Sequence, residues 1–170
     1  MKKLLFLFCL LSWSALNAQK TINRPPFIAK ATETIEIAAV HLSDTATVID
    51  VDAKFTPKYW IRIAPATCLV ADNGERYQVR QGVGIELGQE FWMPESGEAT
   101  FSLIFPPLPP SVKSFDFVEG EGERDFNLFG ISLTGKLPKL QLPKGLEKAG
   151  KMTAAVSYTH LRAHETEADL

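Results

Sequence analysis

The sequence contains little cysteine, little histidine and no excess of charge of either sign. Among its 170 residues there are 2 cysteines and 3 histidines, and 18 basic residues stand against 20 acidic ones, for a formal net charge of -2. The shortage of cysteine and histidine leaves little material for a metal or redox site, so we expect no metal and no cofactor. The absence of a basic excess argues against nucleic acid as a partner.

The residues that are present are typical of one globular domain. Hydrophobic residues make up 45% of the chain and charged residues 22%, which argues against disorder. The 11 glycines, 11 prolines and 10% aromatic residues favour short strands and turns over a helix bundle. We therefore expect an all-β fold over residues 19–136, an antiparallel β-sandwich of immunoglobulin-like type with about seven to nine strands.

Residues 1–18 have the three-part organisation of a secretory signal peptide. Two lysines precede an apolar stretch from Leu4 to Leu11, and small and polar residues follow it up to Ala18. Cleavage is expected between Ala18 and Gln19. The apolar stretch is too short to span a bilayer, so no membrane anchor is expected. These features predict an exported protein, first of all a periplasmic one, with an extracellular or cell-surface location as the alternative.

The composition changes again towards the C-terminus. Residues 137–155 lose the strand-like alternation and gain lysine and proline, which predicts a linker. Residues 156–170, VSYTHLRAHETEADL, resemble a translated transposase sequencing adapter over eleven consecutive residues, and we interpret them as a non-native tail. His160 and His164 are four apart with Glu165 adjacent, a spacing that zinc sites use on helices. If residues 156–170 are a non-native tail, this histidine pair is not a metal site of the protein. A helical metal site is the minor alternative.

Alternating apolar and polar residues predict the strands. The clearest strand is Glu98 to Phe105, in which Ala99, Phe101 and Leu103 share one face with Phe105. Residues 47–55 alternate in the same way and direct Phe55 inward. Phe129, Ile131 and Leu133 repeat the pattern near the end of the domain, and further strands are expected at 34–40, 59–63, 67–72, 75–81 and 114–118.

The dipeptide Asn73-Gly74 predicts a two-residue type I′ hairpin turn, because this turn needs positive φ at both central positions. The turn places Asp72 opposite Glu75. In that register Cys68 shares an apolar face with its cross-strand neighbours, so we interpret it as a small buried hydrophobic residue and not as a nucleophile.

Three further features have a structural interpretation and a functional alternative. Pro106 to Pro110 is expected to be a stiff crossover between sheets, or alternatively a peptide ligand. The acidic loop from Glu119 to Asp125 is expected to be a solvated turn, or alternatively a weak calcium site. His41 is expected at the end of a strand, with no nucleophile beside it for a catalytic triad.

Two tryptophans and one arginine are the candidate binding residues. If the odd-numbered residues of 59–63 face the core, Trp60 and Arg62 lie together on the outer face. An exposed tryptophan beside an arginine is the type of anchor that interfaces favour. Trp92, in the segment EFWMPESG, is the third candidate, and packing under a neighbouring loop is the alternative for all three.

The longest recognisable stretch runs from Glu90 to Phe117, EFWMPESGEATFSLIFPPLPPSVKSFDF, with LSDTATVIDVDAKFTPKYWIRIA before it and FGISLTGK after it. It resembles the N-terminal β-domain of secreted TlpA-like thiol-disulfide oxidoreductases of gut-type Gram-negative bacteria, over about residues 22–136. In that family a thioredoxin-fold domain follows, and its Cys-x-x-Cys pair carries out the redox chemistry. The sequence has no such pair.

The resemblance implies a truncated product, the non-catalytic accessory domain of an exported thioredoxin-like disulfide reductase. Its partners would then be the downstream domains of its own full-length protein and other periplasmic proteins. The alternative is a stand-alone secreted β-sandwich that binds glycan or protein through Trp60, Arg62 and Trp92. Under either hypothesis the chain as given has no catalytic residue and is not expected to be an enzyme.

Overall fold

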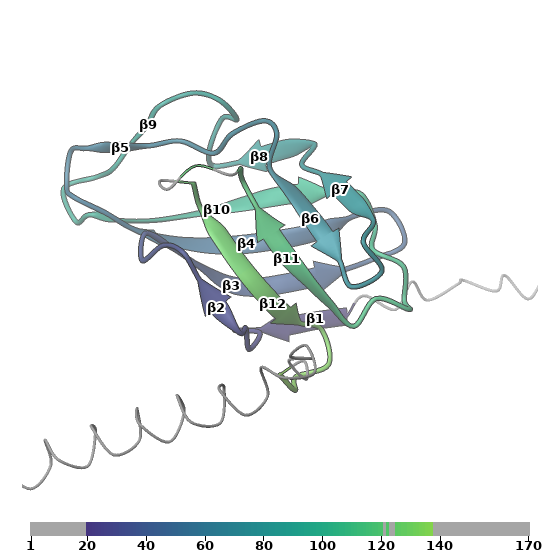
Figure 1. The fold of residues 1–170 in the computed structure, drawn as a ribbon. Helices are drawn as coiled ribbons and strands as arrows, with labels where there is room; N and C mark the ends of the chain where they lie inside the picture. Colours follow the sequence, from purple (N-terminus) through teal and green to yellow (C-terminus); the bar gives the residue numbers. More distant parts are fainter. Residues whose placement is uncertain (1–19, 121, 123–124, 138–170) are drawn as a thin grey trace, which may run out of the picture. The chain divides into compact units, whose positions relative to one another are not determined.

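The computed structural model describes residues 20–120, 122 and 125–137, which form twelve β-strands and no helix (Figure 1). The expected signal peptide with its cleavage site at Ala18 and Gln19, the linker beyond residue 137 and the tail lie outside the described residues. One sheet has the order β1 (Lys20–Asn23), β3 (Ile35–Leu42), β4 (Thr47–Lys54), β10 (Glu98–Phe105) and β8 (Gln81–Val83). The other has the order β2 (Ala29–Lys30), β12 (Asn127–Ser132), β11 (Ser114–Val118), β6 (Cys68–Ala71) and β7 (Arg76–Gln78), and β5 (Trp60–Ile61) pairs with β9 (Phe91–Trp92).

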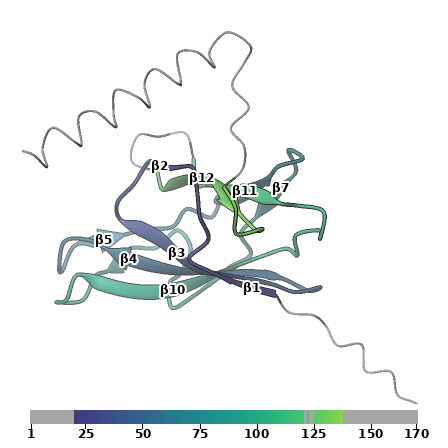
Figure 2. The ribbon, with the colours of Figure 1, turned by 90° about the horizontal axis from the view of Figure 1, so that it is seen from below.

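The two five-stranded sheets form two layers with the core between them (Figure 2). Every strand pair is antiparallel. Phe105 of β10 and Phe117 of β11 meet edge to face across the layers, with ring centroids 6.4 Å apart. Both rings are fully buried, and burying an aromatic side chain stabilises a fold by about 1.5–3 kcal/mol. The expected all-β antiparallel sandwich is therefore confirmed.

The described residues form twelve strands, more than the expected seven to nine, because several short strands lie at the sides of the sandwich. The chain passes from one sheet to the other between β1 and β2, and again between β7 and β8. Arg24, at φ 43°, turns the chain at the first of these corners, and its N–H donates to the carbonyl of Ala38 at 2.8 Å. Edge strands of two to four residues offer little free edge for aggregation.

The alternation in β10 is confirmed. Phe101, Leu103 and Phe105 are at most 4% exposed, because this central strand lies between β4 and β8 and its inner face meets the other sheet. The proline segment after it crosses to β11, as expected. Within this crossover the N–H of Leu108 donates to the buried hydroxyl of Thr47 at 3.0 Å, which fixes the crossover to β4.

The predicted type I′ turn is wrong. Ala71 accepts a hydrogen bond from the N–H of Gly74 at 2.8 Å and donates its own N–H to Glu75 at 2.9 Å. The loop therefore has three residues, and of these only Gly74 has a positive φ, 85°. A type I turn followed by a left-handed glycine closes the hairpin, which shifts the β6–β7 register by one residue from the predicted one.

The prediction that Phe129 faces the core is also wrong, because β12 contains a bulge. Phe129 is 39% exposed, whereas Leu128 and Ile131 are buried. Gly130 adopts φ 65° between them, and its N–H donates to the Asp116 carboxylate at 2.6 Å. Such a bulge sets two residues of one strand against one of its partner.

Candidate functional site

The three sequence-predicted binding residues lie on one two-stranded ribbon. β5 pairs with β9 so that Trp60 lies directly opposite Trp92. Residues directly opposite in an antiparallel pair project to the same face. Trp60 is 39% exposed and Trp92 is 59% exposed, and Arg62, two residues beyond Trp60, is exposed as well. Trp60 and Arg62 are both exposed, and the pairing of β5 with β9 places Trp92 beside Trp60.

The inward face of the ribbon attaches it to the core. Ile61 is 3% exposed and Met93 is 2% exposed. Two hydrogen bonds join the strands beside them, from Met93 N–H to the carbonyl of Tyr59 at 2.8 Å and from Lys58 N–H to the carbonyl of Met93 at 3.2 Å. Gly97 ends the turn after β9 at φ 70°, where an added Cβ would lie 2.6 Å from the carbonyl oxygen of Phe55. Only glycine fits this position.

A groove runs along β5 on the side away from β9. Its aromatic lining includes Phe55, Tyr59 and Trp60, and the rings of Phe55 and Tyr59 meet edge to face with centroids 6.2 Å apart. Phe55 and Tyr59 were both expected inward, and that expectation is wrong. They are 38% and 59% exposed, because β4 ends at Lys54 and the chain leaves the sheet before reaching β5.

Charged groups also line this groove. The guanidinium-bearing Arg62 and the carboxylate-bearing Glu119 and Asp125 belong to it. Glu119 accepts hydrogen bonds from the N–H of Ala64 at 2.7 Å and from the N–H of Phe126 at 2.8 Å. Burial raises the pKa of Glu119 above its ordinary value, and the two backbone donors oppose that rise only in part.

The acidic loop was expected to be a solvated turn, and for Glu119 this is wrong, since its carboxylate joins the loop to the segment after β5. Asp125 accepts from the N–H of Gly122 at 2.7 Å within the same loop. Residues 121, 123 and 124 lie outside the described residues, as do His160 and His164. Elsewhere, in the part of the chain that the structure covers, no group of three or more potential metal ligands comes together.

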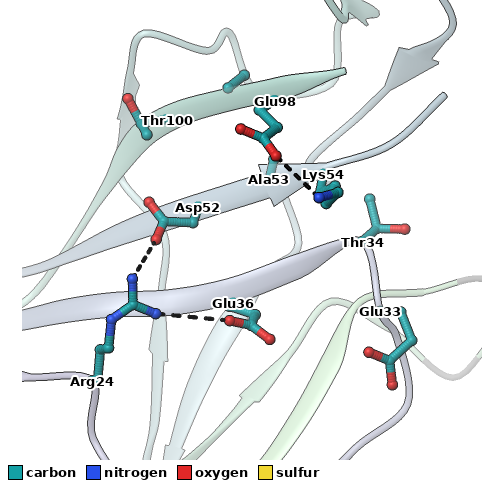
Figure 3. A pocket seen from close by; sticks show the side chains of 10 residues that line it. Arg24, Glu33, Thr34, Glu36, Asp52, Ala53, Lys54, Glu98 and Thr100 are labelled. Carbon is teal, nitrogen blue, oxygen red and sulfur yellow. Dashed lines mark hydrogen bonds and ion pairs between the residues drawn. The ribbon is translucent and has the colours of Figure 1, made fainter. Parts of the chain in front are cut away.

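A second groove, on the outer face of the first sheet, contains paired charges (Figure 3). Glu36 and Asp52 lie opposite each other on β3 and β4. Arg24 lies between them, with N–O distances of 3.9 Å to Glu36 and 3.5 Å to Asp52. Lys54 pairs with Glu98 at 3.0 Å. Exposed pairs of this kind contribute about 0–1 kcal/mol each to stability.

His41 takes part in a hydrogen-bonded chain across four strands that the sequence did not reveal. Its Nε2 lies 2.8 Å from the Asp50 carboxylate, and its Nδ1 lies 2.9 Å from the hydroxyl of Thr21. The hydroxyl of Ser102 donates to the other Asp50 oxygen at 2.7 Å. Partial burial opposes ionisation of Asp50, but the hydrogen bonds from Ser102 and His41 outweigh it and lower its pKa. This chain of contacts ties β1, β3, β4 and β10 together.

Cys68 is buried, as predicted, although on a different face from the predicted one. It is 5% exposed, lies opposite Gln78, and its Sγ accepts a hydrogen bond from the guanidinium of Arg76 at 3.3 Å. Leu69 and Ala71, not Cys68, project into the main core. The given sequence contains one other cysteine, Cys9.

Comparison with known proteins gives no relative. No family model, no curated protein and no solved structure matches the chain. Over the described ranges no helix is long and apolar enough to cross a membrane.

Proposed function

We propose that this chain is the non-catalytic N-terminal accessory domain of an exported thioredoxin-like disulfide reductase, whose Cys-x-x-Cys domain lies outside the sequence. In this role the sandwich positions the thioredoxin domain or contacts its protein partners. The observation that carries the non-catalytic assignment is the burial of Cys68, which is 5% exposed. Thiol-disulfide exchange needs an accessible thiolate and a resolving partner.

The proposal includes export, the immunoglobulin-like type of the sandwich, and the linker over residues 137–155. Support for export comes from the three-part, signal-like organisation of residues 1–18. Support for the sandwich type comes from the two five-stranded antiparallel layers. The family resemblance over about residues 22–136 supports the reductase context.

A thiol-exchange assay tests the non-catalytic assignment. The purified chain is expected to reduce insulin or glutathione disulfide no faster than its Cys68→Ser variant. Turnover by the chain that is clearly above this control would contradict the proposal, because it would require Cys68 to be reached by a substrate disulfide.

A second candidate function is a stand-alone secreted binding module for glycan or protein. The specific observation in its favour is the pair of exposed indoles at Trp60 and Trp92, with Arg62 next to them. Binding at this surface would change tryptophan fluorescence. Fluorescence that stays constant with a panel of glycans and with periplasmic extracts would argue against this candidate.

A further inference from the structure

The backbone of β5 leaves one edge of the ribbon open. The carbonyls of Tyr59 and Ile63 accept hydrogen bonds from Met93 and Gly88, both at 2.8 Å, so these odd-numbered residues direct their polar backbone groups towards β9 and the segment that precedes it. Successive residues of a strand direct their N–H and C=O groups to alternate edges. The backbone groups of Trp60 and Arg62 therefore point to the opposite edge.

That edge has no strand beside it. β5 pairs with β9 alone, and no described backbone group hydrogen-bonds to Trp60 or Arg62. The next N–H on the same edge, that of Ala64, donates to the Glu119 carboxylate at 2.7 Å. The backbone groups of Trp60 and Arg62 on this edge are therefore open. At Ala64 the Glu119 carboxylate accepts the hydrogen bond that a neighbouring strand would otherwise accept. An unpaired strand edge is a template for pairing with another chain.

The groove described above lies along this edge. It has a volume of about 600 Å³, within the ~300–1,000 Å³ range of ligand sites. Trp60, Tyr59 and Phe55 provide apolar surface for side chains, and Thr32 and Thr34 from the connection between β2 and β3 belong to the same lining. An extended peptide uses both features, because its backbone pairs with the edge and alternate side chains contact the lining.

The charges of the groove restrict the partner further. Arg62 contributes one positive charge, while Glu119 and Asp125 contribute two carboxylates. A peptide whose alternate, groove-facing side chains include a basic one among apolar ones complements this balance.

We propose that the open edge of β5 binds an extended segment of a partner protein as an added antiparallel or parallel strand, in which the alternate residues that face the groove are apolar with a basic residue among them. This inference rests on the proposed role of the sandwich in contacting protein partners, and it names the chemistry of that partner. A glycan is the competing occupant, since exposed indoles alone would also suit a sugar ring.

Amide hydrogen exchange measured by NMR on the whole chain tests the proposal. The probe is an end-blocked synthetic peptide in which valine and lysine share the alternate positions that face the groove and serine occupies the positions between them. Without it, the amides of Trp60 and Arg62 should exchange quickly, while the Met93 amide, which is hydrogen-bonded, is protected. At a peptide concentration of about ten times Kd, protection of the two open amides should rise roughly tenfold. No added protection at any soluble peptide concentration would overturn the proposal.

Two controls separate backbone pairing from other contacts. Of two peptides N-methylated on the amides of one edge or of the other, the one that is methylated on the pairing edge should fail to protect Trp60 and Arg62, while the other should still protect them. Equal binding of the two methylated forms would overturn the proposal. Arg62→Pro removes one edge N–H and should abolish binding, whereas Arg62→Ala keeps that N–H and should retain binding within a few-fold. Proline is tolerated at open edge positions. If Arg62→Pro fails to fold, the methylated peptides and Arg62→Ala still test whether the peptide binds through backbone pairing.

Soluble oligosaccharides are the competing ligand in the same exchange experiment. Protection of the Trp60 and Arg62 amides by soluble oligosaccharides and not by the peptide would overturn peptide pairing in favour of a sugar site. Failure of the peptide experiment leaves the accessory-domain proposal in place, because that proposal is tested separately by thiol exchange.

Discussion

Trp60 lies directly opposite Trp92 across the β5–β9 ribbon, and both indoles project away from the core. Beneath them Ile61 and Met93 are buried. The ribbon is thus attached to the sandwich by its inner residues, while its largest side chains make no comparable contribution to the core. Solvent-exposed aromatic residues held on a rigid support are typical of binding surfaces.

Replacing either tryptophan should therefore affect stability only slightly. Trp60→Ala and Trp92→Ala are each expected to lower the free energy of unfolding by about 1 kcal/mol or less, with a coupling between them of about 0.2–1 kcal/mol in the double mutant. Urea unfolding of the four proteins measures both quantities. A loss above about 3 kcal/mol for either single variant would show that the indole is a structural residue, which would remove the argument for a binding surface.

The corner at Arg24 gives a second prediction. Its φ of 43° is a left-handed conformation, which costs a non-glycine residue about 1–2 kcal/mol. Glycine avoids this cost, but it loses more backbone entropy on folding, which offsets part of the gain. Arg24→Gly and Arg24→Ala lose the same ion pairs to Glu36 and Asp52. The glycine variant should nevertheless be more stable than the alanine variant by about 0.5–1 kcal/mol. Equal thermal midpoints for the two would contradict the left-handed corner.

Glu119 gives the third prediction. Glu119→Gln replaces one of two accepting oxygens with an amide donor, so that either Ala64 or Phe126 loses its acceptor. The expected loss in the free energy of unfolding is about 1–3 kcal/mol at neutral pH. Chemical denaturation measures it, and Glu95→Gln, at an exposed carboxylate, serves as the matched control.

The raised pKa of Glu119 adds a pH dependence with a defined sign. Because the folded-state pKa lies above the unfolded one, the stabilisation linked to the protonated carboxyl is present below the unfolded pKa and is lost as the pH rises through the folded pKa. NMR titration of the side-chain carboxyl should give a value above that of an exposed glutamate. A value below it would contradict the burial of Glu119.

Asp50 should titrate in the opposite direction. Its pKa is lowered in the folded state, so its contribution to stability is present above the unfolded pKa and is lost as the pH falls through the folded pKa. Ser102→Ala removes one donor and should shift the NMR titration of Asp50 upward, towards the value of a free aspartate. An unchanged titration in this variant would mean that the Ser102 hydroxyl does not bind Asp50 in solution.

The central strands could be predicted from sequence because their two faces have different environments. Alternation in β10 and β11 follows from an inner face that meets the opposite sheet. The bulge in β12 could not be predicted, since it depends on Asp116, a residue of the neighbouring strand, binding the N–H of Gly130. The prediction of the turn at Gly74 was wrong for a different reason. The dipeptide Asn73-Gly74 is compatible with the two-residue turn, which needs two left-handed residues, and also with a three-residue loop, in which Gly74 alone is left-handed.

The candidate site was predictable in composition but not in arrangement. The sequence predicts Trp60 and Arg62 together on one face and Trp92 only as a separate candidate, because strands of two residues such as β5 and β9 carry no signal for their pairing. The pairing that joins them is a long-range contact, for which neither segment carries a local signal. The role of Glu119 was missed because its two donors, Ala64 and Phe126, come from different segments.

The central claim, that the chain is the accessory domain of a disulfide reductase, is tested most directly by sequencing the source gene across the codon for Ala155 and beyond. The account predicts that the reading frame continues into a thioredoxin-like segment with a Cys-x-x-Cys pair. A frame that encodes residues 156–170 as they stand and then stops would contradict it, and would favour the stand-alone binding module.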